Sequence, residues 1–150
     1  MPVSTTRNLL DAVKQFHEKV ALYCEKNARI NKDERVRMLL DYISRHENHL
    51  AEALEAYEDQ AREKVLNTWF RNVPEKLADV PGEPPLNPDS SADEVIAWAL
   101  KMDNTIIELY QSMGAEAEIA DVKKVVNALL DMENREKLKM VRSALRIDDI

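Results

Sequence analysis

The sequence predicts an all-α fold, a bundle of two antiparallel helix hairpins joined by a long crossover connector. Only two glycines occur, and five of the six prolines lie between Pro74 and Pro88. The rest of the chain therefore suits helices far better than turn-rich β structure. Apolar residues recur at spacings of three and four in four segments, as on the buried faces of amphipathic helices. With 150 residues, the chain fits one domain with its own core.

The first hairpin is expected over residues 6–70. Its first helix spans about residues 6–27, with an apolar stripe at Leu9, Val13, Phe16, Val20 and Tyr23. Its second helix is expected to begin at Asn31, where Asn31 and Glu34 have the spacing of a capping box. The stripe of this helix consists of Val36, Leu39, Tyr42, His46, His49 and Ala53. The helical pattern continues to Trp69–Phe70 and should end before Pro74.

Residues 71–90 form the expected connector, and residues 91–146 the second hairpin. Ser91 and Glu94 predict a capping box at the start of the third helix, which runs to about residue 113. Gly114 is expected to cap its C-terminus. The fourth helix spans about residues 118–146. Because both inner loops are short, each pair of helices is antiparallel, and the long connector makes the second and third helices roughly parallel.

The two hairpins also match each other as an internal repeat. A shift of 87 residues lays Tyr23 on Tyr110 without a gap in the first inner loop. We interpret the match as an old duplication, because such repeats indicate architecture before activity.

Composition excludes several function classes. The net charge of −7 argues against a general nucleic-acid binder, which needs a basic surface. Cys24 is the only cysteine, so neither an internal disulfide nor a Cys-x-x-Cys site can form. We expect it to be a small buried side chain. Without an apolar signal region or a membrane-length apolar run, the chain is expected to be cytoplasmic, with no membrane partner.

Five polar side chains interrupt the apolar stripes. His46 and His49 are three residues apart on the second helix, Glu133 and Glu136 on the fourth, and Asp103 lies on the third. Spacings of three place both members of a pair on one helix face. Burying such groups alone costs several kcal/mol per ion. We therefore expect them to meet, either around a metal cation or in a hydrogen-bonded charge network.

This pattern resembles the ferritin-like superfamily of di-iron carboxylate bundles, which includes ferritins and rubrerythrins. Those bundles carry one Glu on each of two helices and Glu-x-x-His on each of the other two. The resemblance covers most of residues 6–146 apart from the connector, and it includes a carboxylate, Asp103, seven residues before Tyr110. The ligand pattern departs from the family. Phe16 stands where a Glu belongs, and the paired motifs read His-x-x-His and Glu-x-x-Glu.

The resemblance implies a degenerate or mononuclear metal site holding one Fe, Mn or Zn ion, with iron-handling or weak oxidoreductase activity. Its ligands would be His46, His49, Asp103, Glu133 and Glu136. The alternative is a non-enzymatic interaction protein that has lost the metal site and acts through helix contacts.

Four further side chains carry expectations of their own. In the alternative, the chain forms a homodimer through the region of Trp69. His17 is expected at the boundary or surface of the bundle. Trp69, Phe70 and Trp98 are expected to pack beneath the connector.

Overall fold

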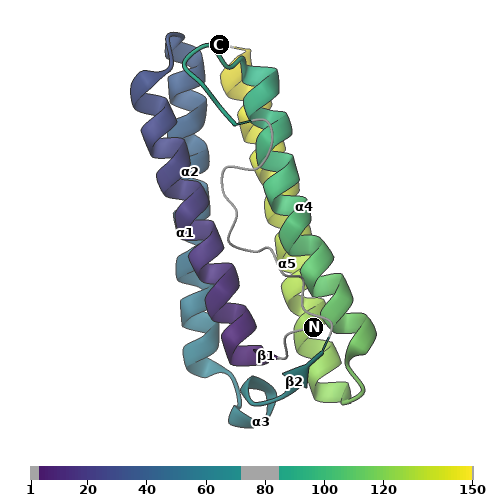
Figure 1. Ribbon diagram of the computed structural model, residues 1–150. Coiled ribbons are helices and arrows are strands. Elements are labelled where there is room, and N and C mark those ends of the chain that lie inside the picture. Colours follow the sequence, from purple (N-terminus) through teal and green to yellow (C-terminus); the bar gives the residue numbers. More distant parts are fainter. Residues whose placement is uncertain (1–3, 72–84, 150) are drawn as a thin grey trace.

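The computed structural model describes residues 4–71 and 85–149, and over these ranges it confirms the predicted all-α bundle. In this part of the chain four long helices lie alongside one another: α1 (Thr6–Ile30), α2 (Glu34–Gln60), α4 (Ala92–Glu116) and α5 (Ala120–Asp148). Figure 1 shows α1 beside α2 and α4 beside α5 as two antiparallel pairs. The pairs contact each other mainly through α2, which packs against both α5 and α4.

The predicted capping box at Asn31 is wrong, because the N-cap of the helix lies two residues later. Asp33 is the N-cap of α2, and its carboxylate accepts hydrogen bonds from the backbone N–H groups of Arg35 and Val36. Asn31 instead accepts from the N–H of Asp33 and donates to the carbonyl of Ser90. The hairpin loop is thereby tied to the residues that precede α4.

The prediction that the second helix continues to residue 70 is also wrong. α2 ends at Gln60, a short helix α3 (Glu63–Leu66) follows, and strand β2 (Trp69–Phe70) pairs antiparallel with β1 (Ser4–Thr5). A straight continuation would carry Val65, Leu66 and Phe70 past the end of the bundle. The turn after Gln60 buries all three instead, which gains the free energy of removing apolar surface from water.

In the second hairpin the predicted capping box is confirmed. The Ser91 side chain accepts from the N–H of Glu94, and the Glu94 carboxylate accepts from the N–H of Ser91. Gly114 does not cap the helix as predicted. It lies buried inside the last turns of α4, facing α5, and the helix ends only at Glu116.

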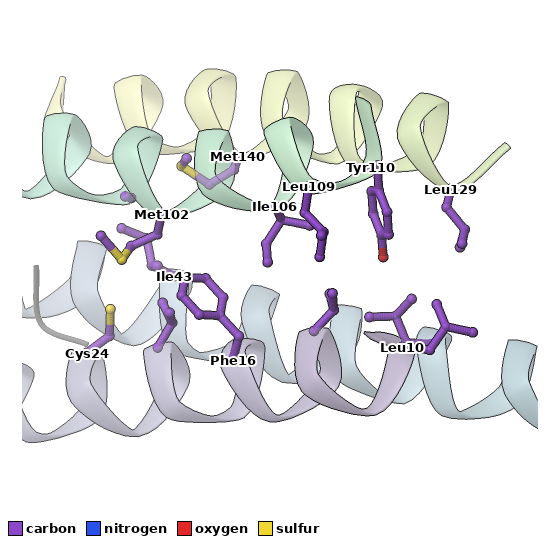
Figure 2. Packing of buried hydrophobic residues seen from close by; sticks show 14 of the residues in the cluster. Leu10, Phe16, Cys24, Ile43, Met102, Ile106, Leu109, Tyr110, Leu129 and Met140 are labelled. Atoms are coloured by element: carbon purple, nitrogen blue, oxygen red, sulfur yellow. The ribbon is translucent and has the colours of Figure 1, made fainter. Parts of the chain in front are cut away.

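The core lies between the two hairpins. Figure 2 shows Ile106 and Tyr110 of α4 facing Leu10 and Phe16 of α1, in a layer that continues to Cys24. Burial raises the pKa of the Cys24 thiol, with the Glu47 carboxylate adding to the effect, so this cysteine is a packing residue with little thiolate character.

The tryptophans and Phe70 differ in their placement. Phe70 and Trp98 are buried, whereas Trp69 is 63 % exposed at the end of the bundle, contrary to expectation. Among the described residues, no helix is long and apolar enough to cross a membrane.

Candidate functional site

Each long helix places one titratable side chain in the middle of the core. These residues are His17 of α1, Glu47 of α2, Asp103 of α4 and Glu133 of α5, and no more than 3 % of any of them is exposed. We call these four residues the core cluster. Each continues the apolar stripe of its own helix, so the packing that buries the stripes also carries the four polar groups inward.

His17 lies between two carboxylates. Its Nδ1 is 2.5 Å from Oε2 of Glu47, and its Nε2 is 3.0 Å from Oε1 of Glu133. An ionised carboxylate can only accept hydrogen bonds, so both ring nitrogens must carry a proton. Burial on its own would lower the pKa of His17. The charges and hydrogen bonds of Glu47 and Glu133 outweigh burial and raise the pKa to about 10. His17 is therefore a buried imidazolium at neutral pH.

Asp103 is the member of the core cluster whose protonated form is favoured by its surroundings. Burial and the neighbouring Glu47 and Glu133 carboxylates raise its pKa well above the usual range. Its Oδ2 has no hydrogen-bond partner within the described part of the chain. The carboxyl groups of Glu47 and Glu133 contact the His17 ring, and Asp103 does not share that contact.

We expect Asp103→Asn to be more stable than the wild type at pH 8 and equally stable near pH 4. The folded-state pKa of Asp103 lies above the unfolded value, so its contribution to stability is present at low pH and declines as the pH rises above about 4. Asparagine keeps the shape and cannot ionise. Thermal unfolding at both pH values tests this expectation. An asparagine variant that loses stability at pH 8 would show that the native aspartate is ionised.

The predicted site residues are only partly brought together. Asp103 and Glu133 belong to the core cluster. His46 is buried beside it, with its ring stacked on Tyr42 at 6.0 Å and its Nδ1 3.9 Å from Oε2 of the half-buried Glu136. Burial lowers the pKa of His46 despite the nearby carboxylates, so the ring is neutral at pH 7. Its buried Nε2 has no hydrogen-bond partner among the described residues.

His49 does not lie on the core face as predicted. Its side chain is 83 % exposed and points toward Glu52, with 3.8 Å between Nδ1 and Oε2. The buried face of α2 includes Ile43, Glu47 and Leu50. Side chains that are two positions apart on a helix point in directions that differ by about 200°. His49 is two positions after Glu47, so its side chain points away from the core.

His17 and Glu47 are core residues that were not predicted from the sequence. The expectation of a boundary or surface position for His17 is wrong. Their signal is nevertheless present, because Val13, His17 and Val20 share the four-then-three spacing of Ile43, Glu47 and Leu50. A polar residue that lies between apolar residues at this spacing is therefore a candidate core residue, and His17 and Glu47 both meet this condition.

The metal that a di-iron family implies does not fit this arrangement. Both nitrogens of His17 are occupied by carboxylates, and a protonated imidazole cannot ligate a metal. One oxygen of Glu47 and one oxygen of Glu133 are also engaged by His17. Among the described residues, no group of three or more His, Cys, Asp or Glu side chains is placed to hold a metal ion.

Comparison with solved structures supports the fold. The chain is similar to a Thermotoga maritima protein that is described, by inference, as a ferritin-like diiron-carboxylate protein. The match has a TM-score of 0.64 and 16 % identity, and it covers 96 % of this chain and 97 % of the other. Neither the protein-family models nor the curated proteins gave a match. At this level of identity the likeness defines the fold, so this chain is a ferritin-like helical bundle.

Proposed function

We propose that this ferritin-like bundle works without a metal centre, as a non-enzymatic interaction protein in which His17 pairs with the buried carboxylates of Glu47 and Glu133. The observation that carries the proposal is the position of the His17 ring, with Nδ1 toward Glu47 and Nε2 toward Glu133. The imidazolium supplies the positive charge that buried carboxylates otherwise obtain from a cation.

His17 compensates the charge of two buried carboxyl groups. A buried carboxylate is tolerated when it is paired and hydrogen-bonded. Charge-assisted hydrogen bonds from an imidazolium meet both conditions for Glu47 and Glu133 at once. A metal ion entering the cluster would have to displace a proton from His17, and the raised pKa of that group opposes the exchange.

A second candidate function is favoured by one observation, the two unpartnered buried atoms His46 Nε2 and Asp103 Oδ2. His46, Asp103, Glu133 and Glu136 have the side-chain types that bind one Fe, Mn or Zn ion, but among the described residues they are not placed to hold one. Such an ion would supply iron-handling or weak redox chemistry. Of the ligands expected from the sequence, His49 lies too far outside to take part.

Metal loading separates the two candidates. We expect purified protein incubated anaerobically with Fe(II), Mn(II) or Zn(II) to retain substoichiometric metal after desalting, with an unchanged melting temperature, because His17 already compensates the cluster. Mass spectrometry gives the metal content, and His46→Ala is the matched variant. One metal ion per chain that disappears in His46→Ala would overturn the proposal in favour of the mononuclear site.

The protonation state of His17 gives a readout that needs no metal. Nitrogen NMR of the ring at pH 8 should show both nitrogens protonated, while His46, whose pKa is lowered by burial, shows a neutral ring. A neutral His17 ring at that pH would also contradict the proposal. A cytoplasmic location stays a prediction from the sequence, and cell fractionation tests it.

A further inference from the structure

A line of basic residues runs along the outer face of α5. We call it the basic ridge, and it consists of Arg135, Leu138, Lys139, Arg142, Leu145 and Arg146, all exposed. Their spacings of three and four place them on one helix face, opposite the buried Glu133, Met140 and Ala144. Within the described part of the chain no carboxylate lies within 4 Å of these four cations, although Asp131 begins the same face one turn earlier.

The first hairpin carries a groove of the opposite charge. It lies between α1 and α2, has a volume of about 460 Å³, and is lined chiefly by four carboxylates and two apolar residues. We call it the acidic groove, and its residues are Lys14, Glu18, Leu22, Glu25, Asn48, Ala51, Glu52 and Glu55.

The charge inside the acidic groove is only partly compensated. Lys14 pairs with Glu55, and Arg29 pairs with Glu25 from outside. Glu18 and Glu52 have no Lys or Arg within 4 Å among the described residues. Two carboxylates thus stay available to an incoming cation.

The two surfaces match in spacing as well as in charge. Glu18 and Glu25 are seven residues apart with the half-exposed Leu22 between them. Arg135 and Arg142 are also seven residues apart, and Leu138 lies between them. Seven residues of helix span about 10 Å in both cases. When a helix lies along a groove, its contact residues recur every three, four or seven positions, as they do here. In each surface an apolar side chain lies between two charged ones.

We propose that the basic ridge of one copy of this chain docks into the acidic groove of a second copy. The inference rests on the proposed function, for which it names the partner. The ridge and the groove lie on the outward faces of different hairpins, so one molecule cannot join its own two surfaces. The contact is therefore head-to-tail between copies. Because its ion pairs are exposed, the association is weak and is screened by salt.

Sedimentation velocity on the full chain, at low and high salt, tests the proposal. The wild type should associate with rising concentration at low salt and dissociate at high salt. Arg135→Glu/Arg142→Glu should be monomeric, and so should Glu18→Lys/Glu52→Lys. An equimolar mixture of the two variants should associate again, because the reversed ridge of one fits the reversed groove of the other. The matched control, Lys64→Glu/Lys123→Glu, changes as much charge at the α3 end of the bundle and should associate like the wild type.

Several outcomes would overturn the proposal. These are a monomeric wild type at low salt, charge-reversed variants that associate like the wild type, or a mixture that stays monomeric. Association that survives both reversals and is lost in Trp69→Ser would move the interface to the exposed Trp69. None of these results bears on the metal content or the His17 ring, so this proposal and the proposed function fail independently.

Discussion

Replacing His17 with alanine is expected to lower the free energy of unfolding by about 3–5 kcal/mol, the usual cost of breaking a buried ion pair by removing one partner. Glu47 and Glu133 would remain in the core, close to each other and without the imidazolium between them. Urea denaturation at pH 7 measures the change, with the slope showing whether the transition stays two-state. His49→Ala serves as the control. Its side chain lies on the surface, so its effect should stay within about 0.5 kcal/mol.

The double variant Glu47→Gln/Glu133→Gln separates charge from shape. It keeps the side-chain size and a hydrogen-bond acceptor opposite each ring nitrogen, and it leaves no unpaired buried charge once His17 is neutral. We expect it to lose less stability than His17→Ala, although two residues change. If His17→Ala costs no more than the double variant, compensation of charge is not what His17 contributes.

The second large effect is a loss of stability at alkaline pH. The folded-state pKa of His17 is about 10, against about 6.5 in an unfolded chain. Because the folded-state value is the higher one, the contribution is fully present below pH 6.5 and is lost as the pH rises to 10. At 1.36 kcal/mol for each pKa unit, the contribution at stake is roughly 5 kcal/mol.

Other buried groups also lower the stability of the folded state as the pH rises. The contribution of His17 must therefore be measured as a difference between two proteins. Burial also raises the pKa of Cys24 and of Tyr110, and both favour the unfolded state at high pH. Glu47→Gln/Glu133→Gln keeps these two residues and removes the interactions that raise the pKa of His17. Urea denaturation gives the free energy of unfolding of both proteins at each pH between 6 and 10. The difference between the two series is the contribution of His17. If the free energy of unfolding changes with pH in the same way in both proteins, the pKa of His17 is not raised.

The architecture was predictable because helical stripes, short inner loops and a proline-rich connector leave little choice of topology. The end of α2 was not, since no glycine or proline lies between residues 60 and 70. That helix stops because Val65, Leu66 and Phe70 gain more from covering the bundle end than from continuing straight. A helix end that is determined by tertiary packing has no signal in the neighbouring sequence.

The candidate site was predictable in kind but not in its members. Asp103 and Glu133 were found because each interrupts a clear apolar stripe. Glu47 was missed because the stripe of the second helix was placed through His46 and His49, which lie one residue before and two residues after it. His17 was missed because its neighbour Phe16 was placed on the stripe of the first helix. A displacement of one residue turns a side chain by about 100°, so the choice between neighbouring faces depends on packing between helices.

The division of the core cluster between the two hairpins also bears on how the bundle assembles. His17 and Glu47 are 30 residues apart within the first hairpin, whereas His17 and Glu133 are 116 residues apart. Local contacts close at lower entropic cost than distant ones, so the first pair can form before the hairpins dock. Docking displaced by one helical turn would move Glu133 by about 5.4 Å along the bundle axis. Its carboxylate would then be buried without the imidazolium, at a cost of several kcal/mol. The core cluster thereby favours one alignment of the two hairpins. The apolar stripes alone specify this alignment poorly, because they repeat in a similar way along each helix.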